Sequence, residues 1–269
     1  MSPDPVHSQS DLGDFSSVQL PNAGPPPKGE ILHSFFHRSV LQISDTRVLK
    51  LGADITPGEA DMMHFVKKHV PSVPCPTVHS VEVYEEGPFP KIGIFMDRVP
   101  GSTLEAIWPS ASDQAKDSYI AQLRELIQRL REPTGQFLGK IGHRACMDPG
   151  GFGVNDSCMG PFDDEESFNR YRLERVRVEK GDDAANRVAS LQKSGHRFVL
   201  THGDLSGRNI FVKDGKITGL VDWESSGWYP EYWEWIQAQT SPSHDSCWRQ
   251  VLGQVLEPYP EMLELEELF

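Results

Sequence analysis

Three polar residues, Asp204, Asn209 and Asp222, have the types and spacing to hold a hard divalent cation and to accept a proton. They lie in one segment, FVLTHGDLSGRNIFVKDGKITGLVDWE, residues 198–224. Carboxylate and neutral oxygens, together with waters and phosphate oxygens, are the ligands that Mg²⁺ accepts in proteins. Asp204 stands on a loop from which it can orient a hydroxyl and take its proton. Any one of these residues alone would be an ordinary cap or turn former, so the interpretation depends on all three occurring together.

A hairpin must position Asn209 and Asp222 for this chemistry. In the stretch IFVKDGKITGLV, two apolar runs flank Asp214-Gly215, which is a strong signal for a two-residue turn. With that turn, Asn209 pairs across from about Leu220, and Asp222 lies about 7 Å further along the same edge. The hairpin is therefore expected to bring an amide and a carboxylate to one edge of a sheet.

The pattern of apolar runs and turn residues in residues 30–100 predicts a small sheet with one helix. The runs HRSVLQIS and TRVLKLG predict two strands joined at Ser44-Asp45-Thr46, and VHSVEVYE and KIGIFMDRV predict two more. Thr56-Pro57-Gly58-Glu59 predicts a capping box that opens a helix between the two strand pairs. Residues 1–29, rich in Pro, Ser, Asp and Gly, predict a disordered tail. Pro100-Gly101 is the first clear break, and we place the boundary between two lobes there.

Residues 101–269 predict a second, mainly helical lobe. Apolar residues at helical spacing between Ser112 and Arg131 indicate a helix with a core-facing stripe. The chain from Trp233 to the C-terminus is again helical in pattern, and its last run, EPYPEMLELEELF, is typical of an amphipathic helix that covers a core. We interpret Trp233 and Glu234 as structural residues beneath the loop that carries Asp204.

Bulk properties exclude several classes of protein. The 269 residues are 38% hydrophobic and 24% charged, no apolar run approaches the ~20 residues of a membrane helix, and the N-terminus has neither a secretory nor a mitochondrial pattern. We therefore expect a cytoplasmic protein with no membrane partner. The net charge of −13 disfavours a nucleic-acid partner and would suit a cationic substrate, although solubility is the simpler explanation.

Metal sites built from cysteine or histidine are not favoured by the sequence. The four cysteines are scattered without a C-x-x-C pair, which argues against a disulfide framework or a thiolate zinc site. His33 and His37 are four apart, as two ligands on one helix face would be, but Phe35 and Phe36 between them are typical of core or strand residues. No third ligand lies nearby in the sequence.

The stretch HGDLSGRN resembles the H-G-D-x-x-x-x-N catalytic loop of the aminoglycoside phosphotransferases and choline kinases, and Asp222 falls where that family has its metal-binding Asp. The resemblance extends from about residue 30 to the end of the chain. It implies an α+β, bilobal, protein-kinase-like fold with a small sheet-plus-helix N-lobe and a larger, mainly helical C-lobe. It also implies ATP with Mg²⁺ as cofactors and transfer of the γ-phosphoryl group to a hydroxyl of a small molecule, with Asp204 as catalytic base and Asn209 and Asp222 as metal ligands.

The same resemblance implies a nucleotide site in the N-lobe. Lys50, in Val48-Leu49-Lys50-Leu51, is the candidate for binding the α- and β-phosphates, and Glu59 is its candidate partner. The linker IFMDRVPG would place backbone groups of Met96 to Arg98 beside the adenine. Solvent exposure of Lys50 and a pure capping role for Glu59 are the simpler alternatives.

One departure from protein kinases bears on activity. Between Pro27 and Lys50 the only glycine is Gly29, so the G-x-G-x-x-G loop is missing, and Ser39 or Ser44 would have to cover the phosphates. A protein kinase is disfavoured because HGD stands in place of HRD and no D-F-G or A-P-E motif is present. The alternative from another class is a pseudokinase that binds nucleotide or acts as a scaffold without turnover. The sequence does not identify the acceptor or the oligomeric state.

Overall fold

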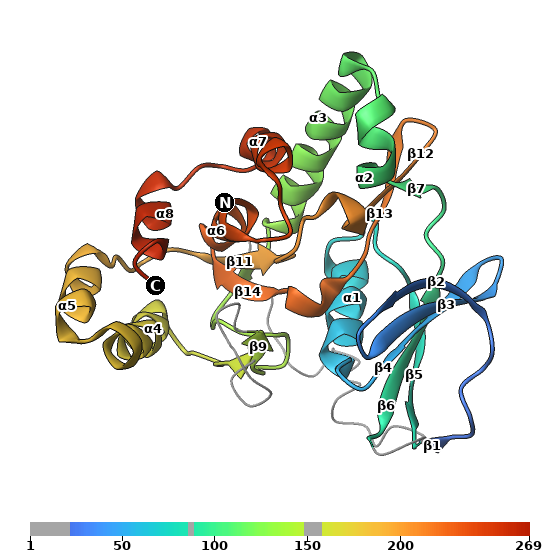
Figure 1. The fold of residues 1–269 in the computed structure, drawn as a ribbon, viewed down its shortest axis with the longest axis horizontal. Coiled ribbons are helices and arrows are strands. Elements are labelled where there is room, and N and C mark those ends of the chain that lie inside the picture. Colours follow the sequence, from blue (N-terminus) through green and yellow to red (C-terminus); the bar gives the residue numbers. More distant parts are fainter. Residues whose placement is uncertain (1–21, 86–88, 148–157) are drawn as a thin grey trace. The chain divides into compact units, whose positions relative to one another are not determined.

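The computed structural model describes residues 22–85, 89–147 and 158–269. These residues form two compact units. Figure 1 shows the ribbon coloured along the sequence from the N-terminus to the C-terminus. The sheet unit contains the described residues up to Gln122 together with Gly207–Ser225, and the helical unit contains those of Leu123–Ser206 and Ser226–Phe269. The division differs from the boundary predicted at Pro100-Gly101, because the segment that follows residue 100 pairs with the hairpin of residues 207–225.

The sheet unit is built on a six-stranded sheet with the order β1-β5-β6-β4-β3-β2. Its strands are β1 (Asn22–Ala23), β2 (Glu30–Phe35), β3 (Arg38–Ser44), β4 (Arg47–Gly52), β5 (Val78–Tyr84) and β6 (Lys91–Asp97). The four strands predicted between residues 37 and 99 are confirmed, and β3 pairs antiparallel with β4 as expected. Leu49, Leu51 and Tyr84 form a buried cluster on this sheet.

Two predictions for the N-terminal region are corrected. Residues 1–21 lie outside the described part, but Asn22–Ala23 form β1 and pair with β5, so ordered chain begins before the boundary predicted at residue 29. Backbone pairing alone is enough for so short a strand. Phe35 ends β2, as the strand interpretation predicts, and Phe36 lies in the turn that follows; with 59% and 84% of their surfaces exposed, neither residue belongs to the core.

The helix predicted after Thr56 is α1 (Pro57–His69), and Pro57 occupies its first turn. Met62, Met63 and Val66 are buried along one face, which fixes the helix in the sheet unit. The predicted capping box does not form, because the Thr56 side chain makes no cap hydrogen bond. The carboxylate of Glu59 instead binds the side chain of a lysine on β4.

The predicted hairpin is present as β12 (Ile210–Lys213) and β13 (Lys216–Leu220), and β7 (Ser102–Thr103) pairs with β12. Asp214 and Gly215 both have positive φ (51° and 75°), as a type I′ turn requires. A bulge between Phe211 and Val212 shifts the register, so that Ile210, not Asn209, pairs with Leu220.

Three helical segments follow β7 in the chain: α2 (Leu104–Ile107), the 3₁₀ turn η2 (Trp108–Ser110) and α3 (Asp113–Leu130). The predicted stripe of α3 is buried at Tyr119, Ile120, Leu123, Ile127 and Leu130, which confirms its core role. The division between the two units falls within this helix. Two further 3₁₀ turns, η3 (Gly207–Asn209) and η4 (Trp223–Ser225), flank the hairpin.

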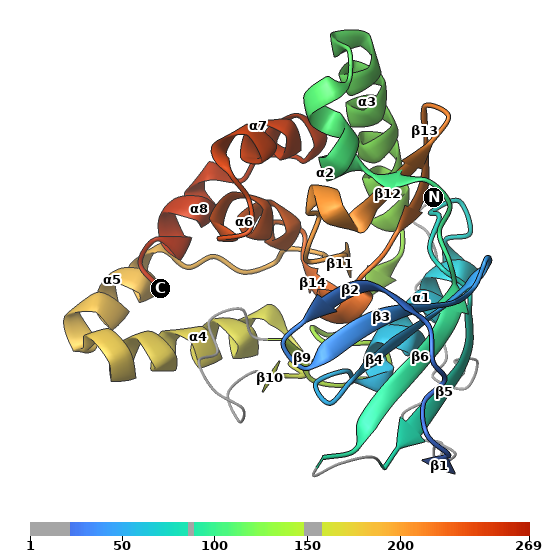
Figure 2. The ribbon, with the colours of Figure 1, turned by 45° about the vertical axis from the view of Figure 1, so that its right-hand side comes forward.

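The described residues of the helical unit combine short strands with the last part of α3 and with α4 through α8, whose course Figure 2 shows. Its strands are β8 (Thr134–Gly135), β9 (Cys146–Met147), β10 (Cys158–Met159), β11 (Phe198–Thr201) and β14 (Gly227–Pro230). Its helices are α4 (Glu165–Lys180), α5 (Asp182–Leu191), α6 (Trp233–Thr240), α7 (Ser246–Val255) and α8 (Pro260–Glu266). Phe168, Tyr229, Tyr232 and Trp233 lie in its core, and Met262 and Leu265 bury the inner face of α8 as the amphipathic pattern predicts. Within the described residues, every helix is too short or too polar to traverse a lipid bilayer.

Candidate active site

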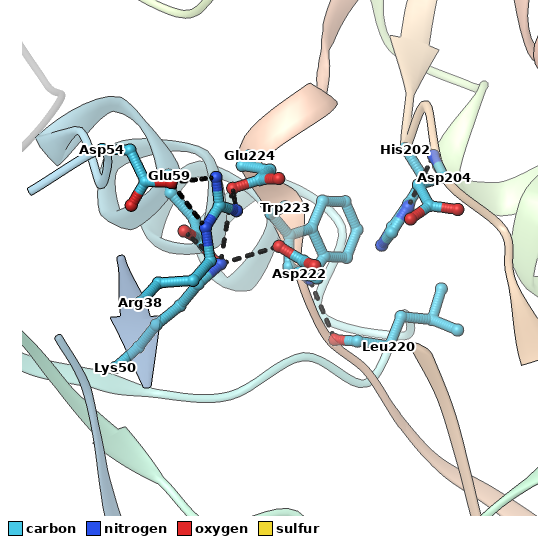
Figure 3. A network of polar contacts seen from close by, with 10 residues as sticks. All are labelled: Arg38, Lys50, Asp54, Glu59, His202, Asp204, Leu220, Asp222, Trp223 and Glu224. Carbon is cyan, nitrogen blue, oxygen red and sulfur yellow. Dashed lines mark hydrogen bonds and ion pairs between the residues drawn. The ribbon is translucent and has the colours of Figure 1, made fainter. Parts of the chain in front are cut away.

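Lys50 on β4 is the centre of a cluster of charged side chains in the sheet unit (Figure 3). Its Nζ lies 2.9 and 2.8 Å from the two carboxylate oxygens of Glu59 and 2.7 Å from Oδ1 of Asp222. A third carboxylate, Glu224, is 3.7 Å away. The predicted pairing of Lys50 with Glu59 is therefore present, and the solvent-exposed alternative is excluded because Lys50 is only 5% exposed.

Burial and charge act in opposite directions on this lysine. Burial alone would lower the pKa of Lys50, but the carboxylates of Glu59, Asp222 and Glu224 outweigh it and raise the pKa well above its usual value. Complete burial raises the pKa of Glu59, an effect that the Lys50 ammonium opposes. The ammonium therefore remains charged at neutral pH and holds three acids together that would otherwise repel one another.

A turn of the backbone at Asp222, directly after the hairpin, places the Asp222 side chain in this cluster. Asp222 has φ of 65°, in the left-handed region that non-glycine residues seldom adopt and that aspartate tolerates better than most. This conformation ends the extended chain after β13. Asn209 lies beside it on the neighbouring strand end, because the carbonyl of Asn209 accepts a hydrogen bond of 3.0 Å from the N–H of Val221. The two predicted metal ligands are thus at adjacent backbone positions, although the bulge changes their register by one residue.

An arginine that the sequence reasoning did not single out completes the cluster. Arg38, at the start of β3, donates to Asp54 through Nε (2.9 Å) and Nη2 (2.7 Å) and to Glu224 through Nη1. The only local signal for Glu224 was its position two residues after Asp222 in VDWE. No local pattern marked Arg38, because its partner is 186 residues away in the chain.

The donor set fits a hard divalent cation. Oxygen atoms of Glu59, Asp222 and Glu224 lie within 4.8 Å of one another, which is the only group of this kind found among the described residues. Three carboxylates that already surround one positive charge are the donors that Mg²⁺ prefers. Glu59 was assigned only to Lys50 by the sequence, so the structure adds Glu59 and Glu224 as further candidates to the predicted pair of Asn209 and Asp222.

Asp204, the predicted base, belongs to the helical unit, where buried polar contacts hold its loop. The fully buried Glu234 accepts hydrogen bonds from the backbone N–H groups of His202 (2.7 Å) and Gly203 (3.0 Å). The N–H of Asp204 donates to Nδ1 of His202 at 3.3 Å, a contact drawn in Figure 3. The structural role predicted for Glu234 is confirmed, and the ring of His202 also holds the loop.

Two residues that the sequence reasoning missed also contact Asp204. The hydroxyl of Ser206 donates to Oδ1 of Asp204 or to Nε2 of His244, which lies 3.0 Å from Ser206 Oγ. Ser206 is two residues from Asp204 within the same motif, so its proximity could have been expected. His244 lies in the loop between α6 and α7, 38 residues further on, and nothing in the local pattern pointed to it.

The predicted adenine contacts of Met96 and Arg98 stay a prediction. The N–H of Arg98 already donates to the carbonyl of Thr46 at 2.9 Å, and that of Asp97 donates to Thr77 at 3.0 Å. Met96 pairs with Val48 and is buried. An adenine bound here would therefore have to use carbonyl groups or displace one of these hydrogen bonds.

Several known proteins similar to this chain are aminoglycoside phosphotransferases. A curated aminoglycoside 3'-phosphotransferase of Enterococcus faecalis is 48% identical over 42 residues, a match that spans 14% of this chain and only 16% of that enzyme. A crystal structure of the aminoglycoside phosphotransferase APH(4)-Ia superimposes with a TM-score of 0.59 at 14% identity, covering 88% of this chain and 81% of that one. An APH(4)-Ia variant in ternary complex with ADP and hygromycin B gives a TM-score of 0.58 at 15% identity, over 88% and 82% of the two chains.

These likenesses to solved structures establish the fold, which is α+β and of the aminoglycoside-phosphotransferase kinase type. The sequence profile of the family described as "Phosphotransferase enzyme family" matches residues 38–257, which include Lys50, Glu59, Asp204, Asn209 and Asp222. With more than half of its length matched, and with the charged cluster around Lys50 in place, the chain belongs to the phosphotransferase enzyme family.

Proposed function

We propose that this protein transfers the γ-phosphoryl group of ATP to a hydroxyl of a small molecule in the presence of Mg²⁺. The observation that carries the proposal is the buried Lys50 ammonium, held by Glu59 and Asp222 at 2.7–2.9 Å. A lysine fixed in this way is a preformed, fully charged site for nucleotide phosphates. Family membership supports the same reaction class.

Each residue has a distinct role in the proposed reaction. Lys50 binds phosphate oxygens of the nucleotide, and Glu59 keeps its ammonium in place. Asn209 and Asp222, with Glu224 beside them, hold the divalent cation, which would neutralise phosphate charge when bound. Asp204 orients the acceptor hydroxyl and takes its proton as the oxygen attacks phosphorus. Glu234 acts through the backbone, because it fixes the two residues that precede Asp204.

The acceptor is proposed to carry amines as well as hydroxyls. Neighbouring structures were solved with hygromycin B, kanamycin and gentamicin, and a chain with a net charge of −13 attracts cationic molecules. A panel of aminocyclitols, amino alcohols and neutral sugars, assayed by coupled detection of ADP, tests this class. Turnover of neutral sugars alone would reject the amine requirement.

The role assignments are tested by two substitutions. Asp204→Ala should abolish transfer while leaving nucleotide affinity nearly intact, because Asp204 acts on the acceptor. Asp222→Ala should instead weaken Mg-ATP binding itself. Equal loss of ATP affinity in both variants would contradict this division of roles, and isothermal titration with a non-hydrolysable ATP analogue measures it.

A nucleotide-binding scaffold without turnover is the second candidate, and one contact favours it. In this structure Asp222 is bound directly to Lys50, and Arg38 binds Glu224, so two proposed ligand-binding groups are already neutralised. Thermal melting with Mg-ATP tests the nucleotide binding that both candidates require, and an acceptor assay then separates them. Binding at a hundredfold excess over Kd should add about 2.7 kcal/mol of stability; absence of a shift at millimolar Mg-ATP rejects the kinase, and a shift without turnover of any acceptor favours the scaffold.

A further inference from the structure

Hydrogen bonds connect Asp204 with Ser206 and His244 inside the helical unit, and their geometry limits which atoms can hold the protons. Oγ of Ser206 contacts Oδ1 of Asp204 and lies 3.0 Å from Nε2 of His244. The direct distance from His244 Nε2 to Asp204 Oδ1 is 3.7 Å, too long for a hydrogen bond, so Ser206 bridges the two. The His244 side chain is 1% exposed, so its ring has almost no direct contact with bulk water.

The other ring nitrogen of His244 decides which atoms donate. Nδ1 lies 3.0 Å from the carbonyl oxygen of Ala238 in the last turn of α6. A carbonyl only accepts, so this nitrogen carries a proton in every state that keeps the contact. Nε2 therefore accepts from Ser206 when the ring is neutral and donates to Ser206 only when the ring is an imidazolium.

A serine hydroxyl has a single proton, and two partners compete for it. If His244 is neutral, the Ser206 proton points to Nε2, and a hydrogen bond between Ser206 and Asp204 then requires a protonated Asp204. If His244 is an imidazolium, Nε2–H donates to Ser206 and Ser206 donates to the Asp204 carboxylate. The two fully bonded states contain the same number of protons and differ only by a shift of two protons along the chain.

We propose that Ser206 and His244 form a proton relay from Asp204, in which His244 receives the proton that Asp204 takes from the acceptor hydroxyl. The inference rests on the proposed function of Asp204 as base. In the step, the proton on Asp204 Oδ1 passes to Ser206 Oγ while the proton of Ser206 passes to His244 Nε2. The Asp204 carboxylate is regenerated, one imidazolium is formed, and no bond between heavy atoms changes.

The surroundings are consistent with a transient imidazolium. The Ala238 carbonyl belongs to the C-terminal turn of α6, where the partial negative charge of a helix favours a cation. The other charged or titratable groups on the neighbouring elements are His202 beside Asp204, Glu234 on α6, and Asp245 and Arg249 at and within α7. Ser243, 3.4 Å from Ser206, is a weaker hydroxyl partner outside the relay.

The shared proton is tested by ¹⁵N NMR of His244 in the full-length protein with labelled histidine. If Ser206 couples the groups, the chemical shift of His244 Nε2 should change in Asp204→Asn and in Ser206→Ala, because this nitrogen shares a hydrogen bond with Ser206, and Ser206→Thr should restore it. Ser243→Ala is the matched control and should leave that chemical shift in place. An identical Nε2 chemical shift in wild type, Asp204→Asn and Ser206→Ala overturns the relay, whether or not the protein transfers phosphate.

Kinetics test the catalytic use of the relay separately. His244→Asn keeps a donor toward Ala238 but cannot take up a second proton, so kcat should fall about tenfold with KM for ATP and acceptor unchanged. The kcat of Ser206→Ala should fall by a similar factor. The proton inventory, which is the dependence of kcat on the deuterium content of the solvent, should be curved in the wild type and linear in the variants. If KM and kcat change by equal factors, or if kcat is unchanged in both variants, the relay is overturned. The role of Asp204 as the base is not affected by that result. Failure of every acceptor with wild-type protein would instead reject the proposed function.

Discussion

The Lys50 cluster and the Asp204 loop both position reactive carboxylates, but through different kinds of interaction. Around Lys50, acids from α1 and from the end of the hairpin converge on one buried ammonium, and side chains make all the contacts. Around Asp204, a buried carboxylate holds the backbone of the loop, and the hydroxyl of Ser206 contacts the side chain of Asp204. The first arrangement depends on charge balance, the second on hydrogen-bond satisfaction.

This difference predicts that the Lys50 cluster responds most strongly to removal of one charge. Lys50→Met leaves Glu59, Asp222 and Glu224 within 4.8 Å of one another, with Arg38 on Glu224 as the remaining cation. We expect a loss of about 3–5 kcal/mol in the free energy of unfolding, the range for breaking a buried ion pair from one side. Urea denaturation measures the loss, and millimolar Mg²⁺ should recover part of it because the cation replaces the ammonium.

A matched double variant sharpens this prediction. Lys50→Met combined with Glu59→Leu removes both the cation and the buried acid, so it should be less destabilised than Lys50→Met alone. A single variant that loses under about 1 kcal/mol, or a double variant that is worse than the single, would show that charge balance does not hold the cluster.

The Asp204 loop is expected to be sensitive to loss of a hydrogen-bond acceptor. Glu234→Ala leaves the N–H groups of His202 and Gly203 without their acceptor in a buried position. We expect a loss of about 2–4 kcal/mol, measured by chemical denaturation. Glu231→Gln is the control, since its ion pair with the 62%-exposed side chain of Arg197 should be worth under about 1 kcal/mol. Similar losses in the two variants would remove the distinction between the regions.

The two regions also differ in how far the sequence predicts them. Asp204, Asn209 and Asp222 were found because strand, turn and loop patterns act over a few residues, and the hairpin turn at Asp214-Gly215 formed as expected. The one-residue error in its register arose from a bulge, which no periodicity announces. Lys50 and Glu59 could be paired only through the family resemblance.

Contacts between residues that are far apart in the sequence could not be predicted from local sequence patterns. Arg38 reaches Glu224 and His244 reaches Ser206 because folded elements bring them together, and each residue alone has many ordinary explanations. Thr56 shows the converse case, because the capping-box pattern was present and the carboxylate of Glu59 was instead bound to Lys50. A buried ion pair outweighs a solvent-facing cap, so the tertiary contact determined the outcome.

His196, in the helical unit, allows the contribution of a charged contact to stability to be tested by changing the pH. Nδ1 of His196 lies 2.8 Å from Glu165, and this hydrogen bond, against a smaller opposing effect of burial, raises the pKa of His196 above 6.5. Glu231 adds to the rise and Lys193 opposes it. Because the folded pKa is the higher one, the stabilisation is complete below about pH 6.5 and is lost as the pH rises through the raised value.

Unfolding free energies of wild type and Glu165→Gln between pH 5.5 and 8.5 test this. The wild type should lose stability relative to the variant as the pH rises through the raised pKa of His196, since the Glu165 carboxylate favours the imidazolium more than a neutral glutamine does. A constant difference across the range would mean that His196 does not gain a proton on folding. The Lys50 cluster should show no such dependence in this window, because the pKa of Lys50 is raised far above it.

Helix caps give the smallest expected effect and the closest comparison between the units. The side chain of Asp245 accepts from the N–H of Trp248 at 2.7 Å at the start of α7, whereas the Thr56 side chain makes no such bond at the start of α1. Asp245→Ala should cost about 1 kcal/mol, and Thr56→Ala under about 0.5 kcal/mol, both measured by thermal and urea unfolding. A larger loss for Thr56→Ala would mean that this threonine caps α1 in solution and that Glu59 is not committed to Lys50. That outcome would weaken the charge-balance account of the cluster at its most buried acid, because a capping Glu59 leaves Asp222 and Glu224 as the remaining acids of the cluster on Lys50.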